Sequence, residues 1–562
     1  DRKGTESDCT VLIALDPKDR GAYLVRGFNR MDIDTEGALA DFDEAVKLDP
    51  TSAEILCARG IAYFTLNRPA DAMADFNRAL ELNPKHANSY ANRAAIHLQA
   101  GRFPEALEDG GKAIECDAKN SNGYVNRGEA RLWLNDADGA LADAEAAIRL
   151  APAKPASIFL RARARHLKGD QAGAMQEYDR LLKEHPRHQA LVSRGRLRGQ
   201  MGDAAGALKD AETALGYEPD DFGALKLRAQ VRIDTKELRK AFEDLTRIID
   251  LGGKDAEVFF IRGRLLLEFK EPKAAEGDFT RAIELKPDAM GPFLFRSRIR
   301  ADAGDLDSAL ADAEESVRLA PDNLEALYNM GRCRHAKRDF DGARADYDRV
   351  LRERPDAAAA RLDRATLRCG TDDMEGTVED ATHLLKSNPK HAEALKLRIR
   401  AWSALKKPRM AVDDLTRYLA LVPEDFEALV RRGRHQFGLK MYKEAAADYT
   451  KAIELKPEKL DLYGMRCEAR FNAGDFEGAL KDVEHTIGKG SDRPEFLQLR
   501  GACRMAIADK DKDKAVELLE SAIKDFEAAL EKGGPTWKVR DFTQEQLEKA
   551  RERLKKVTTE AN

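Results

Sequence analysis

Residues 53–86 read AEILCARGIAYFTLNRPADAMADFNRALELNPKH, and this stretch decides the fold. It holds two segments, ILCARGIAYF and ADAMADFNRALEL, in which apolar side chains recur at helical spacing. Asn67, in the short turn between them, permits the left-handed backbone that commonly ends a helix. Pro84 follows the second segment and stops it, because proline has no N–H to donate. The stretch therefore predicts a pair of helices joined by a tight turn.

The same pattern recurs along nearly the whole chain of 562 residues. A single compact core stops growing near ~250–300 residues, so a chain of this length is expected to form several domains or a repeat array. Nearly every step between repeats is 33 or 34 residues, which indicates an array of fifteen helix pairs. The first helices are expected to begin near Arg20, Ala53, Ala87, Ser121, Pro155, His188, Phe222, Ala256, Met290, Leu324, Ala358, Ala392, Phe426, Leu460 and Pro494.

Positions within a repeat are counted from the start of its first helix. The spacing resembles the tetratricopeptide repeat, which places Gly at position 8, Ala at 20, a large residue at 24, Ala at 27 and Pro at 32. In residues 53–86 these are Gly60, Ala72, Phe76, Ala79 and Pro84. The resemblance implies an all-α fold, a right-handed α-solenoid superhelix with a concave groove. Its Arg-Gly…Asp-Phe form is similar to the arrays of bacterial scaffold proteins and of some cochaperones.

Three parts of the chain are expected. Residues 1–19 are interpreted as the remnant of a preceding repeat, and residues 20–535 as about fifteen repeats. The last repeat carries nine extra residues around 509–514, interpreted as a longer connection between its helices. Residues 536–562 are expected to form a C-terminal capping helix, at about 541–557, and a tail, because the end of a repeat array needs a solvated outer face.

Charged residues recur at two fixed positions. Position 7 is arginine in fourteen of the fifteen repeats, and position 23 is aspartate in fourteen, with Met330 and Glu177 as the exceptions. Both positions lie beside core positions on antiparallel helices, where a guanidinium and a carboxylate can form a bidentate pair. A buried charge needs a partner, so the pattern predicts an ion pair inside each repeat, such as Arg59 with Asp75. The alternative is that these arginines bind a ligand.

One repeat lacks its position 7 arginine. Its acid, Asp346, is expected to pair with Arg332, with Arg334 or with an arginine of a neighbouring repeat. Arginine is also frequent at position 11, where it could flank the groove or form further pairs between repeats. The position 11 arginines include Arg131, Arg165, Arg198, Arg232, Arg300, Arg334 and Arg368.

The resemblance implies that positions 2, 5, 9 and 12 of the first helices line the groove. This lining is apolar toward the N-terminus and basic at position 9 further along the chain. The first helices of the nine repeats from Pro155 to Phe426 carry a summed charge of +19. Because the net charge of the chain is -5, all its other residues together carry -24. The candidate groove residues are Arg163, Arg196, Arg264, Arg298, Arg332, Arg400 and Arg434, with Phe260 and Tyr328 as apolar anchors.

These features favour a non-enzymatic scaffold that binds partner proteins or extended, acidic peptide segments in the groove. Two alternatives stay open: a nucleic-acid-binding repeat protein, and the regulatory subunit of an enzyme complex. Aromatic side chains do not alternate with the groove arginines as single-strand binding would require. The lysines that accompany Asn92 and Asn126 in the carboxylate clamp of chaperone-binding relatives are missing here, which argues against a chaperone tail as the partner.

No catalytic residue, cofactor or metal ligand is expected. His185 and His188 form an HPRH segment that lacks a neighbouring cysteine or acidic cluster in the sequence. The seven cysteines occur singly and favour a reducing, cytoplasmic compartment. Export or a periplasmic location stays open, because the sequence begins at Asp1 without a methionine. No apolar run is long enough to span a membrane, and the oligomeric state is left open.

Overall fold

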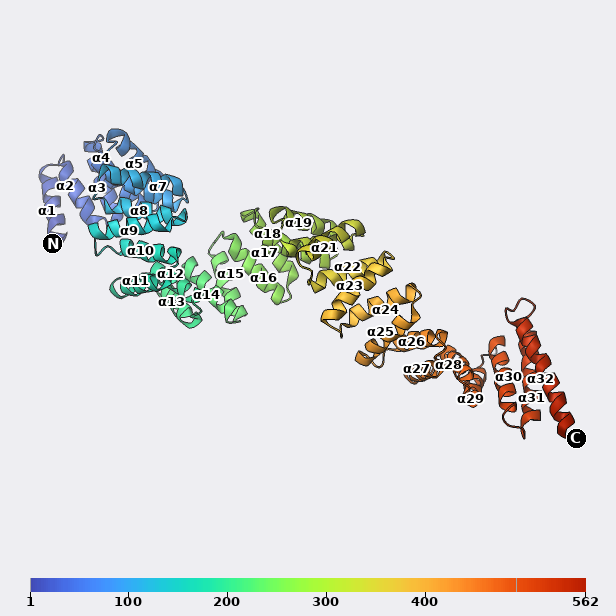
Figure 1. Ribbon diagram of the computed structural model, residues 1–562. Coiled ribbons are helices and arrows are strands. Elements are labelled where there is room, and N and C mark those ends of the chain that lie inside the picture. Colours follow the sequence, from blue (N-terminus) through green and yellow to red (C-terminus); the bar gives the residue numbers. More distant parts are fainter. Residues whose placement is uncertain (1, 492, 562) are drawn as a thin grey trace. The chain divides into compact units, whose positions relative to one another are not determined.

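The computed structural model describes residues 2–491 and 493–561, which form helices joined by short turns. Within these ranges there is no β-strand, which confirms the all-α prediction. Contacts divide the chain into two compact units, Asp1–Pro287 and Asp288–Asn562, each built of successive helix pairs (Figure 1). The handedness of the helix stack stays a prediction.

The first unit opens with α1 (Arg2–Leu15), followed by eight helix pairs. Its first helices are α2 (Arg20–Arg30), α4 (Ala53–Thr65), α6 (Ala87–Gln99), α8 (Ser121–Trp133), α10 (Pro155–Lys168), α12 (His188–Gln200), α14 (Phe222–Asp234) and α16 (Ala256–Glu268). Its second helices are α3 (Thr35–Leu48), α5 (Pro69–Leu82), α7 (Phe103–Cys116), α9 (Ala137–Leu150), α11 (Gln171–Glu184), α13 (Ala204–Tyr217), α15 (Leu238–Asp250) and α17 (Pro272–Leu285).

The second unit has seven helix pairs and a terminal helix, α32 (Arg540–Ala561). Its first helices are α18 (Met290–Asp302), α20 (Leu324–Ala336), α22 (Ala358–Gly370), α24 (Ala392–Ala404), α26 (Phe426–Gly438), α28 (Leu460–Asn472) and α30 (Pro494–Ala508). Its second helices are α19 (Leu306–Leu319), α21 (Phe340–Glu353), α23 (Met374–Ser387), α25 (Pro408–Leu421), α27 (Tyr442–Leu455), α29 (Phe476–Gly488) and α31 (Ala515–Gly533). In both units every first helix begins at the residue that the sequence period predicts.

Small residues let the two helices of a pair approach closely. Position 20, at the start of the second helix, is fully buried in all fifteen repeats, including the one that has Thr377 in place of alanine. Position 8 is often glycine because an aromatic ring at position 24 lies directly against it. A Cβ atom added to Gly263 would lie 2.7 Å from the ring of Phe279, and one added to Gly60 would lie 2.6 Å from that of Phe76. The repeat pattern is therefore a packing requirement.

The last repeat corrects one expectation. Its nine extra residues are spread over both helices and are only partly a longer connection. The helix α30 has 15 residues where α28 has 13, and the connection 509–514 replaces a connection of three residues, 473–475. The helix α31 begins seven residues before its position 20 alanine, Ala522, whereas α29 begins three residues before its own, Ala479, so α31 gains four residues at its start. Ala515, the first residue of the added turn, is buried in the same cluster as Leu519, so the insertion extends the core.

The terminal helix α32 packs against α31 as the expected cap. Leu547 and Ala550 are buried in the same cluster as Leu519 and Phe526, and the rest of the helix is mostly charged. The helix runs to Ala561, four residues beyond the predicted end.

Candidate binding face and its arginines

The position 7 arginines form ion pairs inside their own repeats. In all fourteen repeats that carry it, the guanidinium lies 2.5–2.8 Å from the position 23 acid. All the position 23 acids are at most 7% exposed. Most pairs use two nitrogens, as where Nε and Nη2 of Arg59 each donate to one oxygen of Asp75 at 2.8 Å. The predicted structural role is confirmed.

The remaining nitrogen of many of these arginines reaches the preceding repeat. Nη1 of Arg59 donates to Asp43 at 3.1 Å, and Nη1 of Arg364 donates to Asp348 at 2.5 Å. In other repeats the acceptor at this place is a threonine hydroxyl, as for Arg398 with Thr382. Each such guanidinium therefore joins the two helices of one repeat to the second helix of the repeat before it.

The position 11 arginines reach the same buried carboxylates. Ten of them lie 2.7–3.2 Å from the position 23 acid of their own repeat. This contact within the repeat was not expected from the sequence. The expected pairing between repeats occurs as well, where Arg334 lies 3.6 Å from Glu314 and Arg504 lies 3.2 Å from Glu484 of the preceding repeat. Position 11 follows position 7 by four residues, about one helical turn, so both side chains lie on one face of the helix.

Among the described residues, Asp346 forms an ion pair with a single arginine. Nη1 of Arg334 donates to both of its oxygens, at 2.9 and 3.0 Å, which confirms one of the predicted partners. Burial raises the pKa of this carboxyl to about 6, and the nearby Arg334 offsets the shift only in part. Asp346 is therefore an under-paired member of the series.

The seven candidate groove arginines at position 9 differ in their surroundings. Two residues separate position 9 from position 7, which turns its side chain about 200° around the helix, away from the buried acids. Arg163 pairs with Glu129, and Arg298 pairs with Glu325 at 2.9 Å. The guanidinium of Arg264 lies 5.9 Å from the ring centre of Phe260. The other four are exposed and form no ion pair with any described residue: Arg196, Arg332, Arg400 and Arg434.

The two candidate apolar anchors are half-buried. The ring of Phe260 packs near that of Phe279, with centres 5.9 Å apart. The hydroxyl of Tyr328 donates to Asp363 of the next first helix at 2.6 Å, and its ring packs near that of Tyr347. Tyr328 therefore links neighbouring repeats in addition to presenting a ring edge.

The first unit has a cavity of about 430 Å³ that brings two candidate arginines together. Arg163 on α10 and Arg196 on α12 both line it, and so do Tyr178 and Ser193. The Tyr178 hydroxyl is buried and has no hydrogen-bond partner among the described residues. Burial raises the pKa of Tyr178 to about 12, so the hydroxyl remains a hydrogen-bond donor at neutral pH. The cavity thus offers cationic and neutral donors to an anionic group.

A second cavity, of about 330 Å³, lies between α24 and α26 in the second unit. Arg400, Lys396 and Arg431 line it with the ring of Tyr418 and three acids of the helix starts, Glu393, Asp425 and Glu427. Two of the candidate residues therefore share a cavity in the first unit, and one, Arg400, lines a cavity in the second.

Models of the tetratricopeptide repeat family match residues 53–86, 76–108, 125–188, 192–256, 296–358, 336–368 and 403–459, and a model described as a TPR repeat matches residues 34–67. Together these matches cover more than half of the chain. The chain belongs to the tetratricopeptide repeat family. No curated protein matches it.

Several solved structures resemble parts of the chain, two of them described as tetratricopeptide repeat or TPR proteins. A repeat protein from Parabacteroides merdae is 22% identical over 46% of this chain and 98% of its own, with a TM-score of 0.29. TTC0263 from Thermus thermophilus is 22% identical over 32% and 100%, with a TM-score of 0.30. Pseudomonas aeruginosa pilF is 21% identical over 38% and 100%, with a TM-score of 0.32. The family assignment rests on the repeat models.

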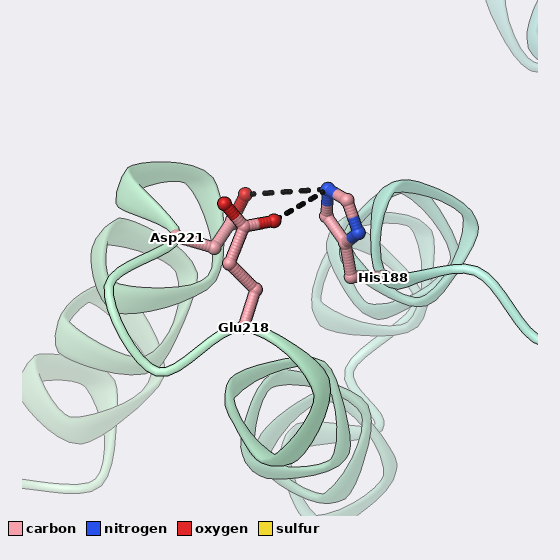
Figure 2. Close-up of side chains that lie close together, drawn as sticks. All are labelled: His188, Glu218 and Asp221. Atoms are coloured by element: carbon pink, nitrogen blue, oxygen red, sulfur yellow. Dashed lines mark ion pairs between the residues drawn. The ribbon is translucent and has the colours of Figure 1, made fainter. Parts of the chain in front are cut away.

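Two further features of this tetratricopeptide repeat chain concern the site. No helix among the described residues is both long and apolar enough to cross a membrane. His188, which has no acidic neighbour in the sequence, lies beside Glu218 and Asp221 in the fold (Figure 2). Sequence reasoning missed this cluster, although its members stand at the two ends of one repeat, which the period brings together and which could have indicated it.

Proposed function

We propose that this tetratricopeptide repeat protein is a scaffold whose first helices bind an extended, acidic segment of a partner protein. The observation that carries the proposal is the state of Arg332, Arg400 and Arg434. These guanidiniums are exposed at one repeat position of the second unit, and none forms an ion pair with a described residue.

The chemistry of the partner follows from the donors. Exposed guanidiniums pair bidentately with carboxylates. Each exposed pair contributes only ~0.2–1 kcal/mol, so affinity depends on the number of contacts along the segment. The neighbouring Lys396 and Arg431 and the ring of Tyr418 add cationic and apolar contacts at one point of this surface.

The test uses two charge-matched triple variants of the full chain. R332E/R400E/R434E reverses the first-helix arginines, whereas R352E/R409E/K451E reverses three exposed cations on the second helices α21, α25 and α27. The probe is a fluorescein-labelled peptide of alternating glutamate and glycine, followed by fluorescence anisotropy. The first variant should lose affinity about tenfold or more, and the second should bind like the unchanged chain.

Equal affinities for both variants, with the fold intact by circular dichroism, would contradict the proposal. Tighter binding to polyuridylate than to the peptide, with a steep salt dependence, would favour the nucleic-acid alternative. Copurification with one defined enzyme that the first variant still binds would favour a regulatory subunit that docks elsewhere.

A further inference from the structure

Three potential metal ligands converge where two repeats meet in the first unit. His188 is the first residue of α12, Glu218 directly follows α13, and Asp221 directly precedes α14. Their side chains point toward one another, and the three ligand atoms all lie within 4.8 Å of one another (Figure 2). The cluster combines one imidazole with two carboxylates from three separate helix ends.

The spacing of the ligand atoms suits a small tetrahedral ion. Nε2 of His188 lies 3.2 Å from an oxygen of Glu218 and 3.7 Å from an oxygen of Asp221. Zinc binds such atoms at ~2.0–2.1 Å, which places two ligands of a tetrahedral site about 3.3 Å apart. Side-chain adjustments of a few tenths of an ångström would therefore complete three of four coordination positions.

Local structure already orients one ligand. One carboxylate oxygen of Asp221 accepts a hydrogen bond from the backbone N–H of Ala224 at 2.6 Å and caps α14, while the other oxygen faces His188. The Asp221 backbone also donates to the carbonyl of Glu218, which fixes the turn between the two acids. Because Asp221 is already held as the cap of α14, its side chain loses little further conformational freedom on binding an ion.

The repeat register makes this cluster specific to one place. His188, Glu218 and Asp221 occupy positions 1, 31 and 34, which approach one another because the period fixes the helix ends. In the first repeat the same contact joins Arg20 to Asp49. Only the repeat that begins at His188 has a histidine, a glutamate and an aspartate at these positions.

We propose that His188, Glu218 and Asp221 bind a divalent transition-metal ion of the zinc class. The neutral imidazole and two carboxylates supply a charge of -2, which balances the ion, and mixed nitrogen and oxygen donors suit zinc. His188 and Asp221 are half-buried and Glu218 is exposed, so the fourth position stays open to water. A bound ion ties the start of α12 to the turn between α13 and α14.

The experiment uses the full chain, freed of metal by a chelator and then titrated with Zn²⁺ by calorimetry. One ion per chain should bind, raise the melting temperature and be removed again by the chelator. Co²⁺ in place of Zn²⁺ should give the visible absorption of a tetrahedral site. Each ligand variant, H188A, E218Q or D221N, should lower the affinity by about tenfold or more and abolish the Co²⁺ signal.

The variants are chosen to preserve the fold. Alanine already begins other first helices at Ala53 and Ala256, and asparagine caps helices as well as aspartate does. H185A removes a histidine three residues from His188 that is outside the cluster and should bind like the unchanged chain. Absence of Zn²⁺ binding, or binding by the three ligand variants as tight as that of the unchanged chain, would overturn the proposal and leave the cluster as an ion pair.

Discussion

At the residue scale, the place of an arginine along the first helix decides what it does. Positions 7 and 11 face the second helix, and their guanidiniums meet at one buried carboxylate, as Arg228 and Arg232 do at Asp244. Position 9 faces away from that carboxylate, and Arg332 and Arg434 are exposed there. A buried ion pair adds little net stability. Removing one partner nevertheless costs roughly 3–5 kcal/mol, because the other charge is left buried and unpaired. The buried arginines thus fix how helices pair.

The natural exception makes this testable. In the Met330 repeat, Asp346 is paired by Arg334 alone. Arg59 contacts Asp75, sixteen residues later in the sequence, and Asp43, sixteen residues earlier. Asp346 and Glu314 hold the equivalent places relative to Met330. M330R would therefore supply a guanidinium where both partners are already present.

The expected effect of M330R depends on pH. The pKa of Asp346 is raised to about 6 by burial, so its stabilising contribution is full below about pH 4 and is lost as pH rises through about 6. A second guanidinium lowers that pKa. M330R should raise the free energy of unfolding by about 2 kcal/mol at neutral pH and change it little near pH 4, measured by denaturant unfolding.

M330L is the control, because it keeps an apolar side chain at the same site and should retain the pH dependence of the unchanged chain. A variant M330R that is no more stable than M330L at neutral pH would show that the buried pairs do not act as described.

Not all residue contacts could be predicted from the sequence. The pairing of positions 7 and 23 was predictable, because both recur beside core positions in every repeat. The second arginine at position 11 was not, because a repeat pattern does not show which way a long side chain turns. The same limit applies to Tyr328, whose hydroxyl contact with Asp363 depends on the offset between adjacent first helices.

At the scale of the helix pair, glycine and an aromatic ring form a complementary unit. Gly263 in α16 lies under the ring of Phe279 in α17, with no room for a Cβ atom. Gly331 and Tyr347 repeat this arrangement, and so do Gly433 and Tyr449. The close approach of the two helices depends on these pairs.

G263A should destabilise the first unit by about 1–3 kcal/mol, because the added methyl group displaces a buried ring. Thermal unfolding measures this. Gly277 in α17 provides the control, since an added Cβ atom there meets nothing within 4 Å. G277A should stabilise the same helix pair by about 0.5–1 kcal/mol, because glycine costs conformational entropy in a helix. Destabilisation of similar size in both variants would contradict the packing argument.

Helix boundaries were the most predictable feature at this scale. Each first helix begins where the period places it, because a packed repeat admits few shifts in register. The insertion in the last repeat was predicted less well. Its sequence, DKDKDK, indicates a loop, but the second helix begins four residues earlier than expected, at Ala515, which is buried by packing that local composition does not show.

At the scale of the whole molecule, each unit is stabilised by contacts between consecutive helices, as expected for a repeat array. Such an array presents the same repeat positions again and again, so a weak contact at one position can be multiplied along the chain. The sequence predicted the candidate binding face as a set of repeat positions on the first helices. The cavity shared by Arg163 and Arg196 and the His188 cluster required coordinates, because both depend on the spatial placement of side chains far apart in the sequence.

We thus infer two roles for the arginines: the buried ones hold the repeats together, and those at position 9 bind an acidic segment. Arginine-selective modification with phenylglyoxal, read by mass spectrometry with and without the glutamate–glycine peptide, tests both halves at once. Arg332, Arg400 and Arg434 should react in the free chain and be protected by the peptide. Arg364, Arg398 and Arg432, whose side chains are 12%, 11% and 16% exposed, should stay unreactive throughout. Equal reactivity of the two groups, or no protection at position 9, would contradict the account.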